Sequence, residues 1–133
     1  LEKILETSTG NMLISKIGDR IQLEQLINQN KINILPFCDI RGYDTTNMKA
    51  IVYIPEAQNL DIELMKIAIQ RIGDDCRLII DGDYNAQVDL QAFEGNNNGM
   101  KRVSKIFRGQ SFYGEVELPI IYRSKMAEWA ENL

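Results

Sequence analysis

Apolar residues along this chain recur at two spacings, and the spacing changes from one segment to the next. A repeat of three to four residues, typical of a helix with one buried face, predicts helices over residues 20–29, 62–72, 100–107 and 124–133. Short apolar runs, typical of buried strands, predict strands over residues 32–37, 50–54 and 77–80, and an alternation of apolar and polar residues predicts a strand over residues 115–121. Helix and strand therefore alternate along most of the chain.

Residues that begin and end helices fit these boundaries. Asn59 and Asp61 are both suitable N-caps for the helix at 62–72, and the sequence leaves the choice between them open. Gly73 is expected to end that helix in a left-handed conformation, and Gly109 is expected to end the helix at 100–107. The polar stretch EGNNNG before that helix is expected to be a loop.

This order of elements predicts an α/β fold with a parallel sheet, helices on both faces and right-handed crossovers. A length of 133 residues, with 44% hydrophobic and 26% charged side chains, fits one domain over residues 1–133. Ligands of such sheets bind at the carboxyl ends of the strands. Polar residues at those ends are therefore the first candidates for chemistry.

Charge, histidine and cysteine content narrow that chemistry. A formal net charge of −4 argues against a generally basic nucleic-acid-binding protein, although it allows a local basic patch. The absence of histidine removes Ser-His and Cys-His nucleophilic pairs, and Cys38 and Cys76 are expected to be buried thiols. No apolar run approaches the roughly 20 residues of a membrane span. The chain opens on Leu1 without a leader, so we expect a cytoplasmic protein and an excerpt of a longer one.

Polar residues suited to a nucleotide follow three of the predicted strands. Glu56 and Gln58 follow the strand at 50–54, Asp83 and Gln87 follow the strand at 77–80, and Arg123 follows the last strand. Carboxylates, amides and an arginine are what a γ-phosphate, its magnesium ion and an attacking water require. Each residue also has an ordinary role: Glu56 as an acid in a first helical turn, Gln87 as a loop amide, Arg123 as a surface cation.

Several segments, in order, resemble the PhoH-like ATPases, a family with a RecA-like core related to superfamily 1 helicases. IVYIPEAQNL is similar to the family's Walker B segment, an apolar strand followed by Asp-Glu-Ala-Gln-Asn, and IIDGDYNAQVD is similar to its Gly-Asp-x-x-Gln-(Ile/Val)-Asp motif. NNNGMKRVSKIFRGQSFYGEVEL resembles the run Ser-Asn-Gly-Leu, Phe-Lys-Gly-Gln, Phe-Gly-His-Val-x-Leu, and YRSKMAEWAENL resembles the Glu-Arg-Ser-x-Leu-Ala ending. INILPFCDIRGY resembles the strand and Ile-Arg-Gly-Arg turn of the branch in which a PIN ribonuclease domain comes first.

The resemblance implies ATP and Mg²⁺ as ligands and a role for each residue. Glu56 would orient or activate the attacking water, and Gln58 and Gln87 would sense the γ-phosphate. Asp83 would contribute to nucleotide binding and to the metal side of the site. Arg123 would stabilise the transferred charge.

The resemblance also places the chain within a larger domain. Arg41 matches the family's arginine in the turn before Walker B and is expected to contact the nucleotide. The loop G-x-x-x-x-G-K-[ST], which holds the β- and γ-phosphates, does not occur in this sequence. The resemblance therefore implies the C-terminal half of a RecA-like P-loop NTPase domain, lacking the Walker A loop and unable to bind ATP tightly alone. Its implied partners are the N-terminal half with Walker A and further copies in a ring.

Two departures from the family pattern bear on hydrolysis. Pro55 stands where the family has its magnesium-coordinating aspartate, and proline offers neither a carboxylate nor a backbone donor. Metal binding is therefore expected to be impaired unless Asp81 or Asp83 substitutes. Residues 84–86 separate Gly-Asp from Gln87, which is one residue more than in the family.

Four cations lie on the helix at 100–107 and just after it: Lys101, Arg102, Lys105 and Arg108. They form either a solvated surface or a strip that follows the phosphates of single-stranded RNA. Two functions stay open at this point. One is ATP hydrolysis linked to RNA unwinding or RNA metabolism, and the other is a non-catalytic PhoH-like module for oligomer assembly or partner binding, with hydrolysis weakened by Pro55.

Overall fold

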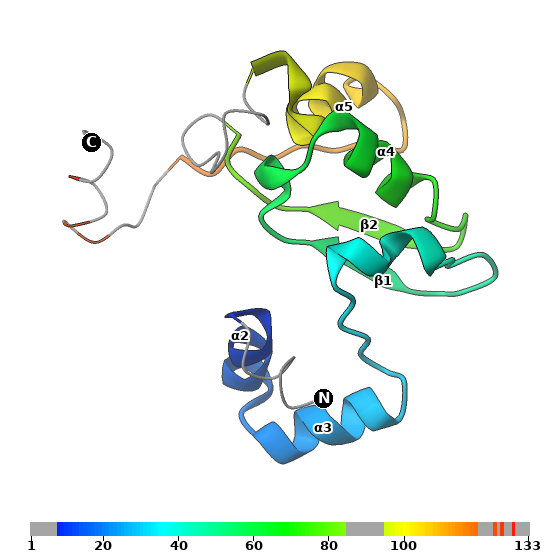
Figure 1. Cartoon of the computed structure of the whole chain (residues 1–133), viewed down its shortest axis with the longest axis vertical. Coiled ribbons are helices and arrows are strands. Elements are labelled where there is room, and N and C mark those ends of the chain that lie inside the picture. The colour runs from blue at the N-terminus through cyan, green and yellow to red at the C-terminus, as the bar shows by residue number, and fades with distance from the viewer. Residues whose placement is uncertain (1–7, 85–94, 120–123, 125, 127–128, 130–133) are drawn as a thin grey trace.

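The computed structural model describes residues 8–84, 95–119, 124, 126 and 129 (Figure 1). Its α-helices are α2 (Ser8–Ile17), α3 (Arg20–Asn28), α4 (Ile62–Ile69) and α5 (Gly99–Phe107). Its 3₁₀ helices are η1 (Phe37–Gly42), η2 (Ala57–Asn59) and η4 (Gly95–Asn97), and its strands are β1 (Ile51–Ile54) and β2 (Arg77–Ile80). The predicted helices at 20–29 and 100–107 and the strands at 50–54 and 77–80 are confirmed. The helix predicted at 62–72 is present but ends three residues early, at Ile69. α2 was not predicted.

β1 and β2 form a parallel pair, with Ile51 opposite Arg77 and Ile54 opposite Ile80. The chain crosses from one strand to the next through α4, and Figure 1 shows α4 and α5 side by side over the strands. Alternate strand residues point toward these helices, since Ile54 is buried and Val52 packs against the same core. The buried members of that core are Ile54, Ala57, Leu60, Met65 and Ala68.

The opposite face of the sheet is exposed. Ile51, Tyr53 and Ile79 keep 71%, 41% and 48% of their surface accessible. The α/β class and the parallel pairing are therefore confirmed, and in the described part of the chain α4 and α5 cover one face of the sheet. Among the described residues no helix combines the length and the apolar character needed to cross a bilayer.

Side chains cap the helices at the boundaries that matter for the site. Asp61, and not Asn59, caps α4, because its Oδ1 accepts a hydrogen bond from the Leu64 N–H at 2.8 Å. Asn98 caps α5 in the same way through the Lys101 N–H, at 2.9 Å. Gly109 follows α5 with φ of +89°, which confirms its predicted role in ending the helix.

The left-handed conformation predicted for Gly73 was wrong. Its φ lies outside the positive region, and its N–H donates to the Thr45 hydroxyl at 2.8 Å. A Cβ atom at this position would lie 2.5 Å from the Thr45 carbonyl oxygen. Close approach of two backbone segments, rather than a turn, is therefore what requires glycine here.

Two predicted strands are absent from the described residues. Residues 32–36 adopt no strand, and the Ile32 N–H donates back to the Leu26 carbonyl instead of to a neighbouring strand. Residues 115–119 also form no strand, and the Glu115 side chain accepts hydrogen bonds from Ser104 and Arg108, on and just after α5. Residues 120 and 121 lie outside the described part, as does most of the helix predicted at 124–133.

Two predictions about buried side chains were half right. Cys76 is buried, but Cys38 on η1 is exposed. On α5, Met100 and Val103 pack on the core as expected, while Ile106 is 52% exposed. The apolar face of α5 is therefore narrower than its sequence spacing suggests.

Candidate functional site at the carboxyl end of the sheet

The backbone binds the carboxyl ends of β1 and β2 together. The Asp81 N–H donates to the Ile54 carbonyl at 3.0 Å, and the Ala57 N–H donates to the Asp81 carbonyl at 2.9 Å. The regular register ends with the pair Ile54 and Ile80, and these two bonds hold Asp81 against the segment from Ile54 to Ala57, which contains Pro55. A carboxylate of the segment after β2 therefore lies close to Pro55, which has none itself.

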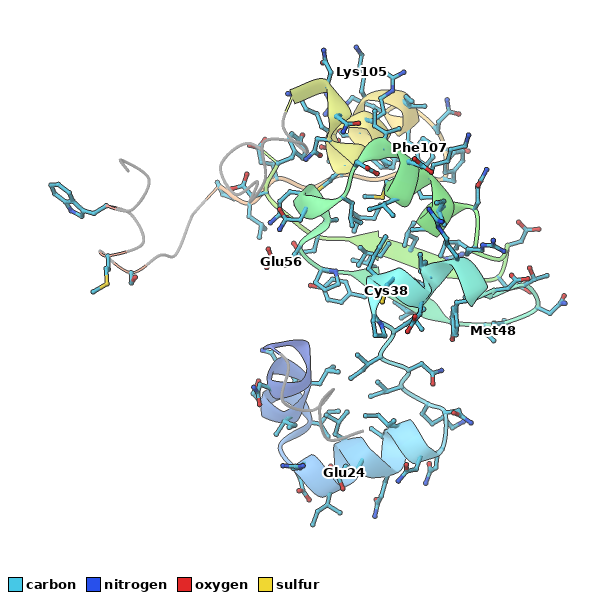
Figure 2. The ribbon with its side chains drawn as sticks, in the orientation of Figure 1. Glu24, Cys38, Met48, Glu56, Lys105 and Phe107 are labelled. Atoms are coloured by element: carbon cyan, nitrogen blue, oxygen red, sulfur yellow. The ribbon has the colours of Figure 1, made fainter. Side chains whose placement is uncertain are left out.

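Glu56 follows Pro55 in a left-handed conformation, with φ of 52° and ψ of 35°. Such a conformation costs a non-glycine residue roughly 1–2 kcal/mol. Strained backbone of this kind concentrates at functional sites, where the surrounding contacts impose it. Figure 2 shows Glu56 at the carboxyl end of the sheet, and its side chain is exposed.

Gln58 joins the two strand ends. Its Nε2 donates to Glu56 Oε2 at 2.8 Å, and its Oε1 accepts from the Asp83 N–H at 3.2 Å. Only 1% of the Gln58 surface is accessible, so these bonds hold the amide in one orientation. Gly82 makes this packing feasible, because a Cβ atom there would overlap Gln58 Oε1.

Tyr53, which was not predicted from the sequence as a site residue, also contacts the carboxyl end of the sheet. The Tyr53 hydroxyl donates to Asp81 Oδ2 at 2.8 Å. That hydrogen bond raises the pKa of Tyr53, and burial and the charges of Asp81 and Glu56 act in the same direction. The signal was present in the sequence, since Tyr53 is the one phenol in an otherwise aliphatic strand.

The described residues suit only a sparsely ligated metal ion. Within them, no group of three or more Asp, Glu, Cys or His side chains lies close enough together to hold an ion. Mg²⁺ is usually bound by one or two carboxylates, with substrate phosphates and water completing its shell. Asp81 and Asp83, on the loop after β2, offer carboxylates of that kind.

The residues that the sequence predicts for the nucleotide site fall in three places. Glu56, Gln58 and Asp83 are brought together as described above. Arg41 lies on η1, where it pairs with Glu63 of α4 at 3.9 Å between two exposed side chains. Gln87 and Arg123 lie outside the described residues.

The basic residues predicted to contact RNA do not form one uniform strip. Lys101, Arg102 and Lys105 are exposed along α5, and Figure 2 shows Lys105 pointing away from the core. Arg108 instead donates to Glu115 Oε2 at 3.0 Å. This hydrogen bond and those from Ser104 hold the pKa of Glu115 below its ordinary value.

Comparison with known proteins identifies a family. The family model described as PhoH-like protein matches residues 7–132. The protein PhoH2 of Bacillus subtilis (strain 168) is 34% identical over 82 residues, which are 62% of this chain and 18% of that protein. The PhoH2 proteins of Thermobispora bispora and Mycolicibacterium smegmatis are 25% and 24% identical over 105 residues, which are 79% of this chain and 23% of each relative.

The chain thus spans about a fifth of the length of these relatives. No solved structure gives a significant match. The branch with a PIN domain stays a prediction, since the matches do not distinguish it. Because the family model covers the chain from residue 7 to residue 132 and includes both strand ends described above, this chain belongs to the PhoH-like family.

Proposed function

We propose that this chain supplies the hydrolysis side of an ATP site in a longer PhoH-like protein that acts on RNA in the cytoplasm. The observation that carries the proposal is Gln58, a buried amide that bonds Glu56 from one strand end and the Asp83 backbone from the next. Gln58, itself buried, would hold the exposed Glu56 carboxylate in one orientation, and that carboxylate would orient the water that attacks a phosphate at these strand ends.

Magnesium fits this site as a ligand shared with the nucleotide. Asp81 and Asp83 would hold it, and bound Mg²⁺ would neutralise the charge that develops on the phosphates. Glu56 keeps its own task of accepting a hydrogen bond from water. The Tyr53 hydroxyl, which donates to Asp81 at 2.8 Å, keeps that carboxylate oriented.

The phosphate-binding loop would come from the other half of the ATPase domain. β1 and β2 have no further strand beside them in the described residues, and Ile51, Tyr53 and Ile79 lie exposed on the open face. Unpaired strand edges and an exposed apolar sheet face are typical of a surface that another part of the protein covers. We propose the half with Walker A as that cover.

RNA would bind along α5. Lys101, Arg102 and Lys105 offer three exposed cations on one helix, which suits sequence-independent contact with phosphates. Arg108 contributes less, because Glu115 already neutralises it. A net charge of −4 keeps the rest of the surface unfavourable to nucleic acid.

One observation favours a second function. Pro55 removes the aspartate that the family uses for magnesium, and a PhoH-like module without hydrolysis would serve oligomer assembly, for example in a ring, or partner binding. The two functions differ in whether the longer protein turns over ATP.

Calorimetry with millimolar ATP and Mg²⁺ tests the proposal. The 133-residue chain alone should give no saturable binding, whereas the longer protein should bind. Micromolar binding by the chain alone would show that its site is complete without the other half. Absence of binding by the longer protein would support the non-catalytic module.

A further inference from the structure

Asn98 is one of the largest fully buried side chains in the described structure, and it lies between the basic helix and the Glu56 site. Its accessible surface is 1%. Its Oδ1 accepts from the Lys101 N–H at 2.9 Å, and its Nδ2 donates to the Gln58 carbonyl at 2.7 Å. One amide therefore caps α5 and fixes the backbone of the residue that orients Glu56.

The surrounding backbone reinforces this link. The Gly99 N–H donates to the Leu60 carbonyl at 2.8 Å, and Asp61 and Asn98 form an antiparallel bridge. A Cβ atom on Gly99 would lie 2.5 Å from the Asp61 carbonyl oxygen and 2.6 Å from the Met65 Cβ. The start of α5 is thus packed directly on the segment that follows Gln58.

We propose that Asn98 is a positioning residue for hydrolysis, which acts through Gln58 on the Glu56 carboxylate and makes the placement of α5 part of the active geometry. The inference rests on the proposed function. Hydrogen bonds run in series from the Lys101 N–H to Asn98, from Asn98 to the Gln58 carbonyl, and from the Gln58 amide to Glu56. A buried series of this kind has few alternative arrangements, since every donor in it would otherwise lose its partner.

The variant Asn98→Asp tests the hydrogen bond from Asn98 to the Gln58 backbone carbonyl separately from the N-cap that Asn98 provides to α5. Aspartate is as good an N-cap as asparagine, so α5 keeps its first turn. The variant replaces the Nδ2 donor by an oxygen that repels the Gln58 carbonyl. Asn98→Ser is the second variant, because serine also caps but is too short to reach the Gln58 carbonyl, and it brings no charge into the core.

The expected result in the longer protein is a kcat for ATP lowered at least about tenfold by either variant, with KM changed less than about twofold. In a Glu56→Gln background the same substitutions should lower kcat no further, because Asn98 acts through Glu56. Asp19→Ala is the matched control. Asp19 caps α3 through the Ile21 N–H at 2.9 Å, so its loss costs a cap away from the site and should leave kcat unchanged.

Hydrogen exchange provides a readout that does not need turnover. The Asp83 N–H donates to Gln58 Oε1, so it should exchange about tenfold faster in Asn98→Asp and Asn98→Ser than in Asp19→Ala. If wild type releases no phosphate, the proposed function fails, but the exchange rate of the Asp83 N–H still shows whether Asn98 holds Gln58 in place. Unchanged Asp83 exchange, or kcat losses that add to that of Glu56→Gln, would overturn the positioning role.

Discussion

Glu56 and its neighbour Pro55 are the two residues on which the proposed ATP hydrolysis depends most. Glu56 is held in a left-handed conformation although it has a side chain, and Gln58 bonds its carboxylate at 2.8 Å. Pro55 precedes it at the end of β1, where proline's missing N–H costs the sheet nothing. The end of β1 thus accommodates a residue that has no backbone donor.

Pro55→Asp should raise magnesium-dependent ATP turnover of the longer protein by about tenfold or more. That factor corresponds to only ~1.4 kcal/mol of transition-state stabilisation, which is modest for restoring a metal contact. Steady-state phosphate release at fixed magnesium measures it. Glu56→Gln in the same background should remove the gain. A fast wild type that Pro55→Asp leaves unchanged would mean that Asp81 and Asp83 already supply every protein contact the metal needs, with none missing at position 55.

Glu115 is the residue whose charge should tie stability to pH. Its pKa in the folded protein lies below the ordinary 4.5, because Arg108 and Ser104 donate to the carboxylate. A depressed pKa contributes stability above pH 4.5 that is lost as pH falls through the folded value. Glu115→Gln should therefore lower Tm at pH 7 and have little effect at strongly acidic pH.

Thermal unfolding of both proteins across pH 3–7 measures this difference. Because the side chain of Arg108 is 72% exposed, added salt should reduce the difference at pH 7. Glu117→Gln is the matched control, because it removes an exposed carboxylate two residues further along the same segment. A Tm difference between wild type and Glu115→Gln that stays constant with pH would contradict the charge-assisted contact.

Sequence alone predicted part of this site. Glu56, Gln58 and Asp83 follow directly from their places after two parallel strands, because such ends meet at one edge. Asn98 was read only as part of a loop before a helix, since its bond to Gln58 joins residues 40 positions apart. No local pattern reports a contact of that separation. Tyr53 was missed for the same reason, since it lies 28 positions from Asp81.

Among the helices, α5 both packs on the hydrophobic core and carries exposed basic side chains. Met100 and Val103 anchor one side of it to the core, and Lys101, Arg102 and Lys105 remain exposed. Its two ends are fixed by the Asn98 cap and by Gly109. A helix held in this way presents its cations at constant spacing.

Replacing Lys101, Arg102 and Lys105 together by glutamate should weaken binding of single-stranded RNA to the longer protein. A plot of log affinity against log salt concentration has a negative slope, and this slope should become flatter by about 2, at roughly 0.7 per lost phosphate contact. Fluorescence anisotropy at several salt concentrations measures the slope. Arg108→Glu alone should change it less, because Glu115 already pairs with Arg108 at 3.0 Å.

A triple change of the same charge elsewhere provides the control for that experiment. Lys16, Lys31 and Lys49 are exposed outside α5, so their replacement by glutamate alters net charge equally. If both triple variants flatten the slope alike, binding follows net charge alone. An unchanged slope in the α5 variant would leave that helix as solvated surface.

Helices and strands were predicted correctly where neighbouring residues alone indicate them, through apolar periodicity and capping side chains. α4 and α5 have periodic apolar residues and clear caps, and β1 and β2 are aliphatic runs separated by a helix. Residues 32–36 share the aliphatic composition of a strand but lack a neighbouring strand in the described structure. Apolar composition indicates that a segment can pair, whereas pairing itself depends on which other strands are present.

At the scale of the whole molecule, the described chain is an incomplete sheet with one covered face. Two parallel strands with exposed Ile51, Tyr53 and Ile79 bury little on their own, and an isolated pair of strands is only marginally stable in water. The relatives are about five times longer than the matched part. Under the proposed function, ATP turnover would require the longer protein, to which this chain would contribute Glu56.

Phosphate release by the longer protein tests the role of Glu56 most directly, with wild type, Glu56→Gln and Glu24→Gln compared at fixed ATP and magnesium. Glu24 lies in α3 and pairs with Arg20 at 3.0 Å, so its substitution removes one carboxylate from outside the site. Glu24→Gln should match wild type, and Glu56→Gln should release phosphate about a hundredfold more slowly, as expected when water loses its orienting carboxylate. An active wild type with an equally active Glu56→Gln variant would contradict the assignment of this strand end to hydrolysis.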